Sequence, residues 1–151
     1  MSKQHLFDTT SIGSWITLGH PAIAEIMAET GFDWLTVDLE HSTITIREAE
    51  DLIRIIELKG VIPLVRLTSN SSEQIKRVMD AGAHGVVVPM VCSGGDARAA
   101  VAAVRYPPVG KRGVGLARAQ GYGSSFETYR SWQANEAIVV VQVEHIDAVN
   151  N

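Results

Sequence analysis

The chain has 151 residues, of which 46% are hydrophobic and 20% charged, and its formal net charge at pH 7 is −4. This profile is typical of a globular domain with a real core; it excludes a fibrous or disordered chain, and the acidic balance indicates no nucleic-acid partner. The polar start does not read as a signal peptide, no apolar run could span a bilayer, and the single cysteine, Cys92, favours the cytoplasm.

Apolar, β-branched runs alternate with helical segments along the chain. In order, we predict strands at 12–18 (weakly), 34–39, 61–67, 85–88 and 138–143, with helices at 21–29, 46–58, 73–79, 97–104 and 126–134. Capping boxes mark three helix starts, and glycines mark three helix ends: Thr45 with Glu48, Ser71 with Gln74, Ser124 with Glu127, then Gly31, Gly60 and Gly82. This alternation predicts one α/β domain over residues 1–151, built on a parallel sheet.

Polar side chains stand near the carboxyl ends of three predicted strands, on the face opposite the helix-facing residues. Asp38 and Glu40 close the second strand, Arg66 closes the third, and Gln142 and Glu144 follow the fifth. An open sheet would bury these groups beneath a helix, whereas a barrel gathers them in its C-terminal mouth, where such enzymes keep their active sites. We therefore expect a (β/α)₈ TIM barrel, of which this chain supplies about the first five strands.

The carboxylates of Asp38, Glu40 and Glu144 would need compensating positive charge in such a mouth. Arg66 offsets part of that charge, and a divalent ion that prefers oxygen ligands, such as Mg²⁺ or Mn²⁺, could offset the rest. A purely structural ion-pair network around Arg66 is an equally open reading. Schiff-base chemistry needs a lysine at a strand end, and none of the four lysines is so placed: Lys3, Lys59, Lys76 and Lys111.

An ordered set of motifs from about Gly13 to the last residue resembles the HpcH/HpaI aldolase family. These are class II, pyruvate-dependent aldolases that include 2-dehydro-3-deoxyglucarate aldolase and 4-hydroxy-2-oxoheptanedioate aldolase. The matching segments, in chain order, are Gly31-Phe32-Asp33-Trp34, Asp38-x-Glu40-His41, Val65-Arg66, Asp80-Ala81-Gly82-Ala83, Val88-Pro89-Met90-Val91, Arg105-Tyr106-Pro107-Pro108-x-Gly110-x-Arg112-Gly113-x-Gly115 and Gln142-Val143-Glu144.

The resemblance implies a role for each matching polar residue. Glu144 would bind Mg²⁺, Mn²⁺ or Co²⁺, and His41 would be the acid and base, positioned by Asp80 through contacts near the barrel mouth. Arg66 would steady the enolate oxygen of pyruvate, and Gln142 would help to hold the substrate. The implied reaction is the reversible cleavage of 4-hydroxy-2-oxo acids to pyruvate and an aldehyde, by a homo-oligomer without nucleic-acid or membrane partners.

The chain departs from the family pattern in one respect. The family's second carboxylate ligand is an Asp after the sixth strand, and this sequence stops at Asn151, before that strand. Five strands cannot close an eight-stranded barrel, so we expect an oligomer or an aggregation-prone chain. Two other functions stay open: a lyase for hydroxy-acid esters of coenzyme A, and a truncated, non-catalytic assembly module. The basic loop 105–123 could hold an anionic group or contact neighbouring subunits.

Overall fold

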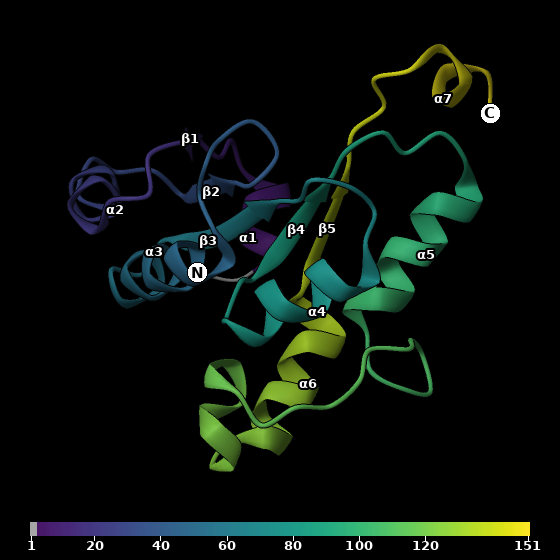
Figure 1. Cartoon of the computed structure of the whole chain (residues 1–151). Coiled ribbons are helices and arrows are strands. Elements are labelled where there is room, and N and C mark those ends of the chain that lie inside the picture. The colour runs from purple at the N-terminus through teal and green to yellow at the C-terminus, as the bar shows by residue number, and fades with distance from the viewer. Residues whose placement is uncertain (1–2) are drawn as a thin grey trace.

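The framework of the protein, in a computed structural model that describes residues 3–151, is a five-stranded parallel sheet (Figure 1). The strand order is β1-β2-β3-β4-β5, so every strand pairs with its neighbour in the chain. This sequential order is that of a barrel wall, whereas a doubly wound sheet reverses its strand order at a switch point. All five predicted strands are confirmed: β1 (Gly13–Ile16), β2 (Trp34–Asp38), β3 (Ile62–Arg66), β4 (Gly85–Val88) and β5 (Ile138–Val141).

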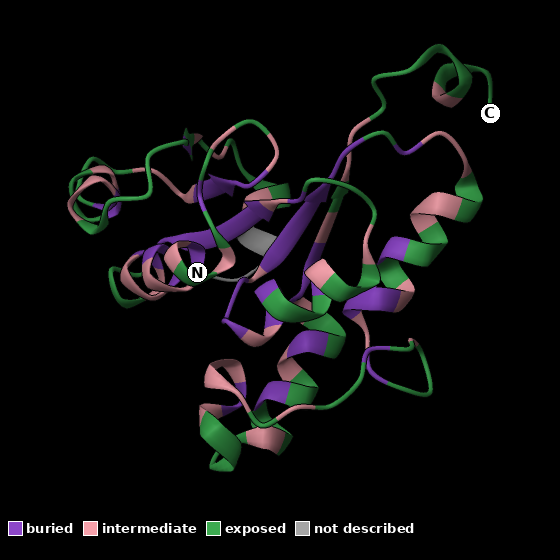
Figure 2. Ribbon diagram, in the orientation of Figure 1, coloured by how far each residue is buried: buried purple, intermediate pink, exposed green. Residues whose placement is uncertain are grey.

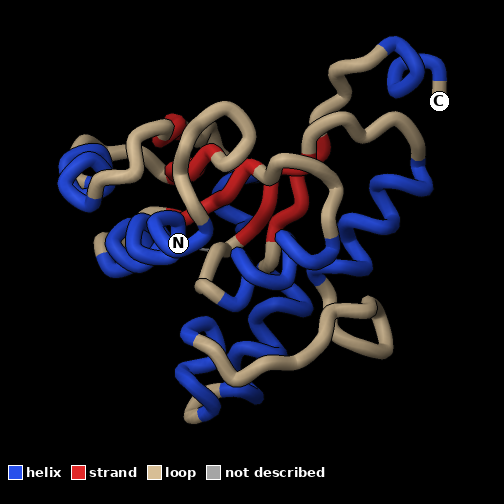
Figure 3. Tube along the Cα trace, viewed as in Figure 1, coloured by secondary structure: helices blue, strands red, loops and turns tan. Residues whose placement is uncertain are grey.

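Helices connect the strands, as the alternating pattern predicts (Figure 3). The five predicted helices are α2 (Pro21–Ala28), α3 (Ile46–Leu58), α4 (Ser72–Asp80), α5 (Gly94–Val104) and α6 (Phe126–Glu136). Three short elements were not predicted: α1 (Lys3–Asp8), the 3₁₀ turn η1 (Arg118–Gly123) and α7 (Ile146–Asn150). Within residues 3–151, every helix is too short or too polar to cross a membrane.

The strands of the sheet are largely buried (Figure 2), and their two faces have different surroundings. Leu35 and Val37 point outward into the main core, which they share with buried side chains of α2, α3, α4 and α5. Alternate positions such as Ile62 and Leu64 point inward and form a smaller cluster. The inner face is thinly covered, since Trp15 on β1 remains exposed. The period-two assignment of faces is therefore confirmed.

One of the three capping boxes forms completely. Thr45 accepts a hydrogen bond from the backbone N–H of Glu48, whose carboxylate accepts from the N–H of Thr45 in return. Ser71 caps α4 through the N–H of Gln74, but Gln74 turns its side chain to Thr68 instead. The box predicted at Ser124 is wrong. The N-cap of α6 is Ser125, and its side chain makes no capping hydrogen bond. The three helix-ending glycines all have positive φ: Gly31 (90°), Gly60 (80°) and Gly82 (107°).

A buried arginine anchors the long loop between α5 and α6. The Arg112 guanidinium donates to Asp80 Oδ1 at 2.6 Å and to the Tyr129 hydroxyl at 2.9 Å, and it lies over the ring of Tyr106. Burial alone would lower the pKa of Arg112, but its interactions with Tyr129 and Asp80 outweigh that effect and raise it. The loop is thus tied to the end of α4 by a permanent charge with 2% of its surface exposed.

We expect Asp80→Asn to lower the free energy of unfolding by roughly 3–5 kcal/mol, because it leaves the buried Arg112 without a counter-charge. Asp51→Asn is the matched control, since Asp51 pairs with Arg54 on the exposed face of α3 and should cost at most about 1 kcal/mol. Urea unfolding of both variants measures the difference. Equal losses would show that the Asp80–Arg112 pair does not anchor the loop.

Candidate functional site

Polar side chains from three strands meet at the carboxyl end of the sheet. Asp38 is the last residue of β2, Arg66 is the last residue of β3, and the two are register partners. Gln142 and Glu144 follow the end of β5 on the same, inward face. Because parallel strands end at one edge, residues that are far apart in the sequence become neighbours there. The predicted convergence of these residues is therefore present within this single chain.

Asp38 and Arg66 form a bidentate ion pair. Arg66 Nε donates to Asp38 Oδ1 at 2.9 Å, and Arg66 Nη2 donates to Asp38 Oδ2 at 2.6 Å. Asp38 Oδ1 also accepts the backbone N–H groups of Glu40 and His41 at 3.0 and 3.3 Å. Burial would raise the pKa of Asp38, but these hydrogen bonds together lower it, so the carboxylate stays ionised. The hydrogen bond to Asp38 likewise raises the pKa of Arg66.

Two further groups hold the guanidinium of Arg66. Glu40 Oε2 lies 3.4 Å from Arg66 Nε, and this buried oxygen makes no hydrogen bond. The ring of Trp15 lies against the guanidinium, 4.6 Å from its Cζ atom. Asp38 and Glu40 thus belong to the ion-pair network around Arg66, which leaves Glu144 as the carboxylate available for another partner. The contact with Trp15 was missed, although period two along the weak first strand places Trp15 on the inward face.

Glu144 and Gln142 form the second half of the cluster. Glu144 Oε1 accepts the backbone N–H of Met90 at 2.8 Å, and Glu144 Oε2 accepts from Gln142 Nε2 at 3.3 Å. Met90 has a positive φ of 52°, a backbone conformation that a non-glycine residue rarely adopts. Gln142 Oε1 is buried without a hydrogen-bond partner, as is the hydroxyl of Thr36 on the same face. The unpaired buried oxygen of Gln142 at this edge could accept a hydrogen bond from a ligand.

The oxygen donors of this cluster suit a divalent metal in kind but are too few. The Glu144 carboxylate and Gln142 Oε1 are hard oxygen ligands of the sort that Mg²⁺ and Mn²⁺ accept. Among residues 3–151, however, no three His, Cys, Asp or Glu side chains lie close enough to hold an ion. Within the described residues, Glu144 and Gln142 therefore do not by themselves make up a complete metal site.

His41 and Asp80 lie at opposite ends of the sheet. The His41 side chain is 72% exposed beside the mouth, with Nε2 at 3.9 Å from Glu40 Oε2. Asp80 ends α4, which runs back from the end of β3 to the start of β4, and it accepts from Arg112 and Gln120 there. The expected contact between Asp80 and His41 near the mouth is therefore not made within one chain. The ion pair of Asp80 with Arg112 could not be predicted from a local sequence pattern, because 32 residues separate the two.

Comparison with known proteins relates the whole described fold to one family. A sequence model of the family described as HpcH/HpaI aldolase/citrate lyase matches residues 11–151. A hydroxypyruvate/pyruvate aldolase from Sagittula stellata is 42% identical over 139 residues, covering 91% of this chain and 54% of that protein. A 4-hydroxy-2-oxo-heptane-1,7-dioate aldolase from Salmonella heidelberg is 40% identical over 141 residues, covering 93% of this chain and 54% of that protein.

Solved structures agree with the sequence relatives. The crystal structure of an HpcH/HpaI aldolase/citrate lyase family protein from Burkholderia cenocepacia superimposes with a TM-score of 0.90 at 33% identity, covering 98% of this chain and 61% of that one. This chain spans about half the length of the curated relatives it matches. Its five strands and their helices form a partial TIM barrel. The chain belongs to the HpcH/HpaI aldolase/citrate lyase family.

Proposed function

We propose that the protein is a metal-dependent, class II aldolase that reversibly cleaves 4-hydroxy-2-oxo acids to pyruvate and an aldehyde. The observation that carries this proposal is the fixed guanidinium of Arg66, held at the strand ends by Asp38 and standing beside Gln142 and Glu144. Family membership and the names of the related aldolases support it.

The guanidinium of Arg66 would stabilise the oxygen of the pyruvate enolate. Asp38 uses Nε and Nη2, and Nη1 makes no hydrogen bond within the described residues, so a substrate oxygen can approach it. Because the pair with Asp38 already fixes the guanidinium, little reorganisation is needed when negative charge develops on the substrate. Gln142, whose Oε1 is unpaired, would hold the substrate beside it.

Glu144 would hold the divalent ion (Mg²⁺, Mn²⁺ or Co²⁺) together with ligands from outside residues 3–151. Such an ion polarises the keto group of pyruvate and makes its methyl protons more acidic. His41 would then take and return the proton, since an imidazole can do both near neutral pH, and its exposure beside the mouth leaves it accessible. Asp80 could position His41 only from a neighbouring chain, because it lies at the other end of the sheet.

We also propose that the protein is a cytoplasmic homo-oligomer. Its one cysteine, Cys92, is a free thiol, which suits a reducing compartment. Strands β1 and β5 are the outer strands of the described sheet, and Trp15 and Val140 on its inner face are exposed. Unpaired strand edges and apolar surface of this kind favour association with further protein.

Pyruvate methyl protons should exchange with D₂O in the presence of the protein and Mg²⁺, and addition of a chelator should stop the exchange. The loss of the methyl signal in the proton NMR spectrum measures enolate formation alone, so no aldehyde has to be chosen. Exchange that survives chelation would contradict the role of the metal. If residues 1–151 show no exchange, the same measurement on a chain extended past Asn151 decides, and its failure there would refute the proposal.

Arg66→Ala should slow this exchange by about 10²–10³-fold, the usual cost of removing one preorganised donor to an oxyanion. Arg54→Ala is the matched control, because it removes the same side chain from exposed ion pairs on α3. Circular dichroism verifies that both variants fold. An exchange rate for folded Arg66→Ala equal to that of the control would rule out the role given to Arg66.

His41→Ala should slow the exchange by about 10²–10⁴-fold, since it removes the proposed acid and base. The control is His145→Ala, which deletes another exposed imidazole, one residue from Glu144. Both rates come from the NMR assay above, recorded at several pH values. If the two variants behave alike, another group moves the proton.

A further inference from the structure

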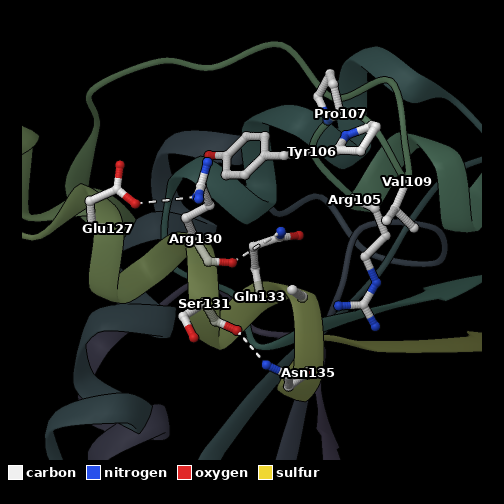
Figure 4. A pocket seen from close by; sticks show the side chains of 11 residues that line it. Arg105, Tyr106, Pro107, Val109, Glu127, Arg130, Ser131, Gln133 and Asn135 are labelled. Atoms are coloured by element: carbon white, nitrogen blue, oxygen red, sulfur yellow. Dashed lines mark hydrogen bonds and ion pairs between the residues drawn. The ribbon is translucent and has the colours of Figure 1, made fainter.

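A cavity lies at the opposite end of β5 from Gln142 and Glu144. Its volume is about 360 Å³, and it lies between the start of the basic loop and α6 (Figure 4). Arg105, Tyr106 and Pro107 form one wall, and Arg130, Gln133 and Asn135 of α6 form the other. TIM-barrel enzymes keep their catalytic groups at the other end of the strands, so this cavity is separate from the cluster around Arg66.

Arg105 brings an incompletely paired positive charge to this cavity. Its Nη2 donates to the carbonyl oxygen of Ala137, just before β5, at 3.1 Å, whereas its Nη1 is buried without a hydrogen-bond partner. Burial, rather than a neighbouring charge, sets the pKa of Arg105 and lowers it. The other cationic group of the cavity, Arg130, already pairs with Glu127 at 3.2 Å. The charge that needs an anion is therefore that of Arg105.

Gln133 carries a buried hydrogen-bond acceptor that lacks a donor. The residue is only 3% exposed, and its Nε2 donates to the carbonyl oxygen of Arg130 at 3.3 Å. Its Oε1 is buried and accepts no hydrogen bond. Arg105 and Gln133 thus line one cavity with a buried donor that lacks an acceptor and a buried acceptor that lacks a donor. Polar atoms in such positions normally have partners, because leaving them unpaired destabilises the fold.

We propose that this cavity binds a small oxyanion that carries a hydroxyl group, such as a hydroxycarboxylate or phosphate. Its anionic oxygen accepts from Arg105 Nη1, which suits the planar guanidinium, and its hydroxyl donates to Gln133 Oε1. The ring of Tyr106 and the side chain of Pro107 form the less polar wall. This site is independent of the proposed aldolase reaction, since no residue of the Arg66 cluster lines the cavity.

Titration of ¹⁵N-labelled protein with D-glycerate, and separately with inorganic phosphate, tests the proposal. We expect saturable shifts of backbone amide signals of Ser131 and Asn135, which line the cavity, and weaker binding of acetate, which has the charge but not the hydroxyl. The probe that binds more tightly shows whether the cavity prefers a hydroxycarboxylate or phosphate. If neither probe shifts these amides, or if acetate binds as tightly as both, the proposal is wrong.

Substitutions then assign the binding to the two unpaired atoms. Arg105→Gln should weaken binding by at least about tenfold, because it removes a charge-assisted hydrogen bond. Arg98→Gln removes the same charge from an exposed position on α5 and should leave the affinity unchanged. Gln133→Glu introduces a carboxylate into the cavity and should abolish binding. Wild-type affinity in folded Arg105→Gln or Gln133→Glu would overturn the proposal, and the amide shifts of the unmodified protein decide if neither variant folds.

Discussion

The pairing of Asp38 with Arg66 depends on strand register more than on either side chain alone. Because β2 and β3 align these residues directly, both polar groups reach the inward face, while Val37 and Val65 enter the main core. A one-residue slip would place Asp38 among the helix-facing apolar side chains, where an ionised carboxylate is very unfavourable. The same alternation of core and polar positions that folds the sheet therefore also keeps a charged guanidinium at its edge. Trp15, Glu40 and Glu144 take their places around that charge.

The two ends of the sheet differ in how their polar and charged groups are paired. At the carboxyl end, the buried Oε1 of Gln142 lacks a partner, and Glu144 is exposed. At the amino end, Arg112 donates to Asp80 and Tyr129 and so fixes the loop there, while its buried Nε makes no hydrogen bond. This division agrees with barrel enzymes in general, in which one end binds and the other stabilises. The cavity beside Arg105 departs from this division, since Arg105 and Gln133, which line it, each carry an unpaired polar atom at the stabilising end.

Local patterns in the sequence were sufficient to predict the framework and the convergence of Asp38, Arg66, Gln142 and Glu144 at one end of the sheet. β-Branched runs located the strands, period two assigned their faces, and Thr45 with Glu48 marked the start of α3 correctly. The failures involve interactions over longer distances or unusual backbone. The capping box predicted at Ser124 failed because η1 directly precedes α6. Tyr122 within η1 has a positive φ, which a non-glycine residue rarely adopts. The position of Asp80 at the amino end of the sheet could not be predicted, because its partner Arg112 belongs to a loop without a periodic sequence pattern.

The sequential strand order also bears on how this protein is made. Each strand pairs with the one before it, at separations of about 21 to 53 residues between register partners such as Gly13 and Trp34 or Gly85 and Ile138. A growing polypeptide can therefore dock each new strand onto an edge that is already formed while the ribosome is still translating the next helix. Loop closure between neighbouring strands is then entropically modest at every step. The interval between β4 and β5 is the longest, because it contains the loop anchored by Arg112 in addition to α5, η1 and α6.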